Sequence, residues 1–267
     1  MEISLARSLF SLNLKSIYII VNRDLNRFWK YRWWLAGLIT MNLADLFIFA
    51  VLFNRIVNRE LIPDYFLFMA PGITAIAAFA SAFSIGREVG VEIRRGFTQY
   101  LLSLPISRLE LAMGRILSGV VRGIIYETPF LILLLILIKI PSTIELVYIL
   151  VASIFMTLTM SSLSIAISTS TRNFDMQATL RSFTYFILFF ISNVFYPEKL
   201  IRVRFPGPLY YVASFNPISL TVSLYREIFG ISQQYPYTPE YILVFLFLWA
   251  ISTMALGGYF YIRNLES

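Results

Sequence analysis

The stretch YFLFMAPGITAIAAFASAFSIG, residues 65–86, contains no charged side chain. A helix that crosses a bilayer needs roughly 20 mostly apolar residues, and this stretch meets that length. The strands of a membrane barrel are shorter and alternate between apolar and polar residues, which this stretch does not do. It therefore predicts a transmembrane α-helix and an all-α integral membrane protein.

Five further segments resemble this one in length and composition. The six expected spans cover residues 33–57, 65–86, 109–138, 146–171, 176–197 and 241–262. Helix-start signals precede four of them, namely Asp64, Ser107 with Glu110, Ser142 with Glu145, and Thr238 with Pro239. We expect a six-span domain over residues 33–262, preceded by an interfacial helix within 1–32 and followed by a tail, 263–267.

The composition supports a membrane protein and excludes most catalytic chemistry. Of the 267 residues, 58% are hydrophobic and 14% are charged, against about half and a quarter in soluble proteins. The absence of Cys and His excludes disulfides, thiol nucleophiles, His-based triads and almost all zinc or haem sites. No Walker A motif is present, so the chain has no P-loop for ATP. We expect neither an enzyme nor a bound cofactor or metal.

The net charge of +7 indicates how the chain sits in the membrane. Lys and Arg concentrate before the first span, within 87–108, around Arg172 and at Arg263. Because cytoplasmic segments are enriched in Lys and Arg, we expect both termini in the cytoplasm, in a multi-pass protein of the cell membrane. Nucleic-acid binding is disfavoured, because the charge is spread along membrane flanks rather than over one soluble face.

Residues 9–31 have the pattern of an amphipathic helix. Apolar residues recur at helical spacing, namely Phe10, Leu14, Ile17, Val21, Leu25 and Phe28, and another face carries Arg23, Asn26, Arg27 and Lys30. Trp33 and Trp34 follow and suit the headgroup level. The pattern favours an anchor that lies on membrane lipids. The other interpretation is that this helix also contacts a partner subunit.

The segment 87–108 is longer than a simple turn. Its apolar stripe consists of Val89, Ile93, Phe97, Tyr100, Leu101 and Leu104. Glu88, Glu92 and Arg95 are spaced by four and three residues, so they are expected to pair on the opposite face. Gly96 predicts a break between two short helices. Docking of a partner is slightly favoured over a loop that lies on lipid.

The long segment 198–239 is expected on the outer side and contains apolar stretches. Asn216 can cap a helix that starts at Pro217 and ends at Gly230. We expect short helices tucked into the outer leaflet, because backbone at that depth must be covered by protein or line a cavity.

Among the ionisable groups inside the expected spans, three are singled out as intramembrane candidates: Asp45 in the first span, and Arg122 and Glu127 in the third. Such groups are costly in lipid and are functional candidates by default. Equally, each acid can be protonated or bonded within a helix interface. Arg122 and Glu127 lie far apart around their helix axis and are not expected to pair. A contact between Asp45 and Arg122 across two helices stays open.

Several motifs, in their order and spacing, resemble those of the ABC-2 type transporter permeases. They are Arg23-Asp24-Leu25, Pro71-Gly72, Gly86-Arg87-Glu88, the run Glu92-Ile93-Arg94-Arg95-Gly96 with Pro105 to Arg108 beyond it, Gly114-Arg115, Asn216-Pro217 and Tyr225-Arg226. The likeness covers nearly the whole chain, although the usual Glu-Arg-Glu run of the family is only partly kept around Glu92.

The resemblance implies a permease subunit of an ATP-driven exporter, a family whose substrates include drugs, lipids and lipid-linked or free glycans. Two copies of a separate ABC ATP-binding subunit would hold ATP and magnesium, and a second permease copy would complete the dimer. Coupling to the ATPase would fall to Arg87, Glu88, Glu92, Arg94, Arg95 and Gly96 in a coupling helix, with Arg23, Asp24 and Arg27 as a second contact. An outer gate would contain Asn216, Pro217, Tyr225 and Arg226.

Two other functions stay open. An ion- or proton-coupled secondary transporter would use Asp45 and Glu127 without ATP, although no clear inverted repeat is seen. A membrane enzyme that acts on lipid is least favoured, because the chain lacks His and Cys.

Overall fold

The computed structural model describes residues 13–53, 62–205, 207–231 and 237–266, and the regular elements of these parts are all α-helices. The long helices are α2 (Leu14–Lys30), α3 (Arg32–Phe53), α4 (Tyr65–Arg94), α6 (Arg108–Leu137), α7 (Thr143–Thr169), α8 (Phe174–Ile191) and α12 (Pro239–Glu266). The short helices are α5 (Phe97–Leu102), α9 (Glu198–Arg204), α10 (Gly207–Ser214) and α11 (Pro217–Ile228). The all-α fold expected from the sequence is confirmed for these residues.

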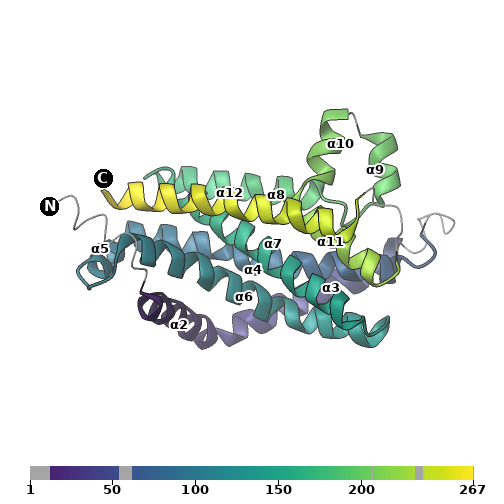
Figure 1. The fold of residues 1–267 in the computed structure, drawn as a ribbon, viewed down its shortest axis with the longest axis horizontal. Helices are drawn as coiled ribbons and strands as arrows, with labels where there is room; N and C mark the ends of the chain where they lie inside the picture. The colour runs from purple at the N-terminus through teal and green to yellow at the C-terminus, as the bar shows by residue number, and fades with distance from the viewer. Residues whose placement is uncertain (1–12, 54–61, 206, 232–236, 267) are drawn as a thin grey trace.

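Four helices, α4, α6, α7 and α12, are long and apolar enough to cross a membrane. They run along the length of the molecule (Figure 1), with α7 packed against α4 and α12, and α4 packed against α6. Helix α3, which packs on α4, has a shorter apolar part, Ile39–Phe53. Helix α8 packs on α7 and α4 and contains Asp175 and Arg181. The described parts thus hold four helices of spanning character, where the sequence predicts six.

The two ends of the bundle differ. Helix α5 and the C-terminal end of α12 lie at one end, which we call the basal end (Figure 1). Helices α9, α10 and α11 lie at the other, which we call the outer end. Helix α2 packs along α6 in the half of the molecule nearer the basal end.

Small residues let α7 approach its neighbours closely. A Cβ added at Gly119 of α6 or Gly257 of α12 would lie less than 3 Å from atoms of Ser161 or Ser162. Ser161 donates a hydrogen bond to the carbonyl oxygen of Ile116 at 2.8 Å. Because lipid gives helices no hydrophobic reason to associate, such close packing and interhelical hydrogen bonding hold a membrane bundle together.

The helix-start signals act as the sequence predicts. Asp64 accepts hydrogen bonds from the amides of Phe66 and Leu67 at the start of α4. Capping boxes begin α6, at Ser107 with Glu110, and α7, at Ser142 with Glu145. Helix α12 begins at Pro239. Local chemistry therefore sets these boundaries.

Two boundaries differ from the expectation. Helix α4 continues to Arg94 instead of ending near Gly86. Within this extension Gly90 is buried and leaves room for the side chain of Gln177. The break at Gly96 is confirmed: this glycine has φ of 68° and precedes α5. Helix α8 ends at Ile191, short of the predicted end of the fifth span at residue 197.

Some expectations concern parts outside the described residues. They are Phe10 in the first amphipathic stripe, the end of the first span at 54–57, residues 232–236 of the outer segment, and Ser267.

Candidate functional site

Charged side chains from three helices meet inside the half of the molecule nearer the basal end. We call them the charge network: Arg23, Asp24 and Arg27 of α2, Glu88 and Glu92 of α4, and Arg115 and Arg122 of α6. Asp24, Arg115 and Arg122 are almost fully buried. Buried charges are costly unless they are paired and hydrogen-bonded, so the network holds the three helices in one arrangement.

Arg122 makes the deepest junction. Its terminal nitrogens donate to the two carboxylate oxygens of Glu88 at 2.6 and 3.1 Å. Nη2 also donates to the main-chain carbonyl of Asp24 at 2.9 Å, and the guanidinium lies 5.2 Å from the centre of the Phe28 ring. A forked arginine–carboxylate pair is strong and specific in geometry, and here it joins α2 and α4 to α6.

Arg115 makes a second junction. Its Nη1 donates to both carboxylate oxygens of Asp24, at 3.0 and 2.8 Å, and its Nη2 forms an ion pair with Glu92. Arg27 donates to the other oxygen of Glu92 at 2.8 Å. Arg23 donates to Asp24 at 2.7 Å. The carboxylates of Asp24 and Glu92 are therefore each shared between Arg115 of α6 and an arginine of α2.

The short helix α5 is connected to this network. The guanidinium of Arg23 lies 5.6 Å from the centre of the Phe97 ring, at the start of α5. Cation–π contacts of this length are favourable. Movement of α5 would therefore act on α2 as well as on α4, the helix that it follows in the chain.

Helical spacing explains why these groups meet. Arg115 and Arg122 lie two turns apart on α6, and Glu88 and Glu92 lie one turn apart on α4. Residues at such intervals share one face of a helix. The two arginines and the two carboxylates can therefore face each other along the same seam.

Glycine and a helix cap bring α2 against α6. A Cβ added at Gly114 would lie 2.8 Å from side-chain atoms of Ile20, so only glycine leaves room for α2 there. The amide of Asn13 donates to the carboxylate of Glu110, in the capping box of α6, at 2.7 Å. These contacts hold α2 against α6 independently of the ion pairs.

The network keeps its central carboxylate charged. Burial by itself would raise the pKa of Asp24, but the guanidinium groups of Arg115 and Arg23 outweigh it and hold that pKa below its ordinary value. Nearby positive charges favour the ionised form of an acid. Asp24 thus stays ionised and paired at neutral pH.

One predicted pairing is wrong, and one contact that the sequence leaves open is not formed. The sequence places Glu92 beside Arg95 on an outward face, whereas the structure buries Glu92 to 5% exposure and pairs it with Arg115 and Arg27. A contact between Asp45 and Arg122 is not formed, because Glu88 holds the Arg122 guanidinium. Spacing along one helix could not reveal that a second helix supplies a better partner.

Helix α2 presents two faces. Its buried residues are Ser16, Ile17, Ile20, Asp24 and Phe28. Leu14, Tyr18 and Trp29 are apolar and exposed. The helix therefore lies on its own chain with Ile17 and Phe28 of its predicted apolar stripe, and another apolar side is left uncovered.

The other predicted coupling residues lie at the surface. Arg87, Arg94, Arg95 and Gly96 are exposed. The guanidinium of Arg94 lies 4.9 Å from the centre of the Phe174 ring, at the start of α8. Of the predicted coupling residues, some thus belong to the charge network, and the others form an exposed basic surface.

A second polar cluster holds α11 at the outer end. Tyr225 donates to Glu127 of α6 at 2.5 Å, and its hydroxyl lies 2.7 Å from that of Ser153 in α7. All three side chains are buried. The second carboxylate oxygen of Glu127 is buried without a hydrogen-bond partner among the described residues. Three helices therefore meet at Glu127.

Arg226 donates hydrogen bonds to the main chain just beyond the C-terminal end of α8. It donates to the main-chain carbonyls of Asn193 and Val194, each at 2.8 Å, and of Phe68 at 3.2 Å. Its guanidinium also lies 3.6 Å from the centre of the Phe68 ring. Buried backbone carbonyls need a hydrogen-bond donor. Arg226 supplies it here and allows α8 to end at Ile191.

Asn216 links the same elements and confirms its predicted role as a cap. Its side chain accepts from the amide of Ile218 at 3.0 Å and donates to the carbonyl of Leu188 at 2.7 Å. Pro217 then starts α11. All four predicted gate residues, Asn216, Pro217, Tyr225 and Arg226, are buried.

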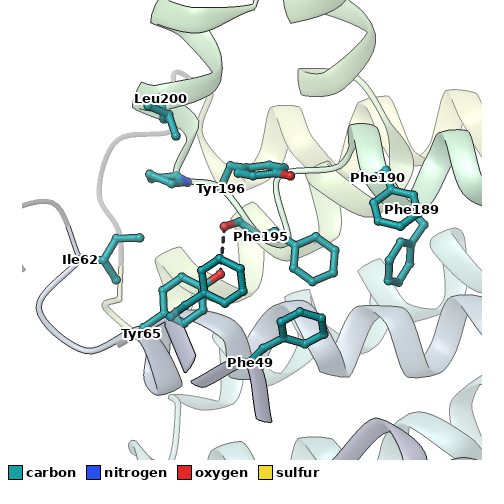
Figure 2. Close-up of a pocket in the computed structure, with 10 residues that line it drawn as sticks. Phe49, Ile62, Tyr65, Phe189, Phe190, Phe195, Tyr196 and Leu200 are labelled. Carbon is teal, nitrogen blue, oxygen red and sulfur yellow. Dashed lines mark hydrogen bonds between the residues drawn. The ribbon is translucent and has the colours of Figure 1, made fainter. Parts of the chain in front are cut away.

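An aromatic pocket of about 340 Å³ lies near this cluster, between residues of α3, α4, α8 and α9 (Figure 2). Aromatic side chains dominate its lining, among them Phe49, Tyr65, Phe189 and Tyr196. The Tyr65 hydroxyl donates to the carbonyl of Phe195 at 3.2 Å. Pockets of this size and character are typical of small-molecule sites.

The family model for the ABC-2 type transporter matches residues 15–229, which covers α2 to α11. The chain belongs to the ABC-2 type transporter family. It is a membrane-embedded permease component of an ABC transporter and is not itself catalytic. Permeases of this family typically pair with an ATP-binding subunit. No curated protein gives a significant match.

Sequence reasoning missed some residues that organise this permease. Arg115 was part of a motif without an assigned partner, although a charge inside an expected span, at helical spacing from Arg122, was a usable signal. Ser153 and Asn193 gave no signal. Ser153 is one of many hydroxyl residues in α7, and only the tertiary fold selects it as the neighbour of Tyr225.

Proposed function

We propose that the permease is the membrane half of an ATP-driven exporter that works as a dimer with two ATP-binding subunits. ATP and magnesium would be held by those subunits. The charge network carries this proposal, because it ties α2, α4 and α5 to α6 near one end of the bundle.

The exposed part of the basal end supports docking there. Tyr100 of α5 is 61% exposed, and Arg94 and Arg95 are exposed beside it in the chain. A short helix that is held by its inner side and free on its outer side can receive a partner. We assign α5, with Arg87, Arg94, Arg95 and Gly96, as the coupling element.

Helix α6 would pass the movement across the membrane. It carries Arg115 and Arg122 in the charge network and Glu127 in the α11 cluster. A rigid helix with a bonded group at each site moves both together. Closure of the ATP-binding subunits would therefore shift α11 at the outer end.

Exposed apolar faces support a second copy of the permease. Phe47, Ile48 and Val51 of α3, and Phe183 and Phe186 of α8, are more than half exposed in the single chain. We propose that α3 and α8 complete six spans and line the dimer, with both termini in the cytoplasm of a cell-membrane protein. The aromatic pocket fits a drug, a lipid or a glycan as substrate, because aromatic rings pack on acyl chains and stack on sugars.

Docking is tested with two tyrosines of equal exposure at opposite ends. Tyr100 is 61% exposed in α5, and Tyr211 is 60% exposed in α10. The tagged permease would be purified from its own membrane, with the P-loop subunit quantified by mass spectrometry and ATP hydrolysis. We expect Tyr100→Ala combined with Arg95→Glu to reduce the amount of co-purified P-loop subunit and the rate of ATP hydrolysis at least tenfold. Tyr211→Ala should leave both quantities unchanged. Equal behaviour of the two variants would remove α5 as the docking site.

Orientation is tested with single cysteines, since the natural chain has none. Ser103 lies at the end of α5 and Tyr211 lies in α10, and both are exposed. A membrane-impermeant maleimide should label Tyr211→Cys on intact cells and Ser103→Cys only after permeabilisation. The reverse pattern would invert the proposed topology.

A second candidate is a proton-coupled transporter centred on Glu127. Its fully buried carboxylate, with one oxygen unpaired among the described residues, favours this reading. Among the described residues, the hydrogen bond to Glu127 comes from Tyr225 and not from Asp45. Transport without ATP that is lost in Glu127→Gln would replace the exporter proposal with this one.

A further inference from the structure

A polar cavity of about 210 Å³ lies at the basal end, where α7 and α12 finish. Its lining includes Arg172, just beyond α7, and Arg263, in the last turns of α12. Ser170, Thr171 and Asn264 add hydroxyl and amide groups. This cavity is separate from the charge network, the α11 cluster and the aromatic pocket.

The cavity presents donors rather than negative charge. Its described lining contains two arginines and no carboxylate. Guanidinium groups bind phosphate through paired hydrogen bonds and are preferred where that group is recognised. The Thr171 hydroxyl, which accepts from the amide of Asn173 at 3.3 Å, keeps its own hydrogen and can donate to an oxyanion.

Carbonyl groups at the end of α7 would oppose an anion, because a helix C-terminus carries partial negative charge. Two of them are already satisfied. Asn264 donates to the carbonyl of Thr169 at 3.1 Å, and Gln177 donates to the carbonyl of Thr171 at 2.6 Å. The protein therefore uses amide side chains for these two carbonyls rather than the arginines. Arg263 donates to the hydroxyl of Tyr259 through one terminal nitrogen, at 3.4 Å.

The place of the cavity favours a lipid headgroup over a soluble metabolite. Helices α7 and α12 both have spanning character, so their shared end lies at the membrane surface. Basic pockets between transmembrane helices on the cytoplasmic side commonly hold anionic headgroups. The volume is below the roughly 300 Å³ at which drug-sized pockets begin.

We infer that Arg172 and Arg263 form a binding site for a phosphate group, presented by an anionic lipid of the adjacent leaflet. The acyl chains would lie along the outer surfaces of α7 and α12, while the phosphate enters between the two arginines. The site does not depend on the proposed export function, but it rests on the proposed topology that places the basal end at the cytoplasmic surface.

The test measures lipid retention by native mass spectrometry and the unfolding temperature of the full-length permease in non-ionic detergent. The probes are phosphatidylglycerol, phosphatidylcholine and inorganic phosphate. The variants are Arg172→Gln with Arg263→Gln, the same pair changed to Lys, and Lys15→Gln as a control at an exposed basic residue of α2. All of these positions are exposed, so folding should be preserved.

We expect the natural chain to retain one more phosphatidylglycerol than the double Gln variant, with about a tenfold weaker apparent affinity in that variant. The double Lys variant should bind at an intermediate level, because it keeps charge but loses the paired geometry. Lys15→Gln should behave like the natural chain. Protection by inorganic phosphate at millimolar concentration would assign the site to the free anion, whereas protection by phosphatidylglycerol alone assigns it to lipid.

Two further results would overturn the inference. One is equal retention of phosphatidylcholine and phosphatidylglycerol by the natural chain. The other is loss of phosphatidylglycerol that is as large in Lys15→Gln as in the double Gln variant, which would show only general attraction to a basic surface.

Discussion

Arg122 of α6 and Glu88 of α4 form a forked ion pair in which the arginine side chain has no exposed surface and the carboxylate keeps 28% exposure. The two charges are therefore not equivalent. Removing Glu88 leaves a charge with no route to water, whereas removing Arg122 leaves one that water can reach.

We predict that Glu88→Gln destabilises the permease more than Arg122→Met does. Loss of one partner from a buried pair costs about 3–5 kcal/mol, and the remaining charge here is the buried one. The double variant should be more stable than the sum of the single changes implies, because no unpaired arginine remains. Unfolding temperatures in detergent measure this, with the exposed Arg87→Gln as control. Additive effects of equal size would contradict the pairing.

The charge network also predicts a response to acid. The folded-state pKa of Asp24 lies below its ordinary value, because Arg115 and Arg23 outweigh the effect of burial. A depressed carboxylate pKa stabilises the fold fully above the unfolded value, about 3.9, and the contribution is lost as pH falls through the folded value. Stability from this residue should therefore be constant at neutral pH and decline below about pH 4.

Asp24→Asn isolates that contribution. This variant should be less stable than the natural chain at pH 7 and should show a shallower loss between pH 5 and pH 3, in the range set by the ordinary aspartate value of about 3.9. Unfolding temperatures across this range provide the measurement. Asp175→Asn, at an exposed position, is the matched control. An acid response in Asp24→Asn as steep as that of the natural chain would place the titrating group elsewhere.

Local signals in the sequence predict helix starts and the Gly96 break, because the chemistry that sets them is local. A capping box at Ser107 needs only Glu110, and a left-handed residue needs only glycine. The all-α membrane fold follows from composition for a similar reason, since a bilayer requires its spanning helices to be apolar.

Partners between helices could not be predicted in the same way. The spacing of Glu92 and Arg95 favours a pair on one helix, yet Glu92 bonds to Arg115 and Arg27 from two others. Burial strengthens the pairing that removes most charge from an apolar interior, and burial is a property of the whole fold. The early end of α8 has the same origin, because Arg226 of α11 supplies the donors that a continuing helix would have supplied.

We predict that Tyr225→Phe loosens α11. The change removes the donor to Glu127 and leaves a buried carboxyl group unsatisfied, at a cost of about 1–3 kcal/mol. A reporter cysteine at Leu224, which has no exposed surface in α11, can be placed in the cysteine-free chain. Maleimide labelling at this site should become about tenfold faster in Tyr225→Phe, since 1.4 kcal/mol corresponds to a factor of ten. Tyr211→Phe, in exposed α10, is the control, and equal labelling rates would show that Glu127 does not hold α11.

Close helix packing gives a prediction with opposite signs at two glycines. A Cβ added at Gly86 of α4 would overlap the main chain of Ser164 in α7, whereas one added at Gly37 of α3 would meet nothing within 4 Å. Gly86→Ala should therefore destabilise the bundle by about 1–3 kcal/mol or more, because neither backbone can yield without moving its helix. Gly37→Ala should be neutral or stabilising by up to about 1 kcal/mol, from helix propensity alone. Both are measured as shifts in unfolding temperature in the same detergent. A stable Gly86→Ala would mean that α4 and α7 lie further apart than the described packing, and the hydrogen bond from Ser164 to the carbonyl of Phe83 could then not hold them.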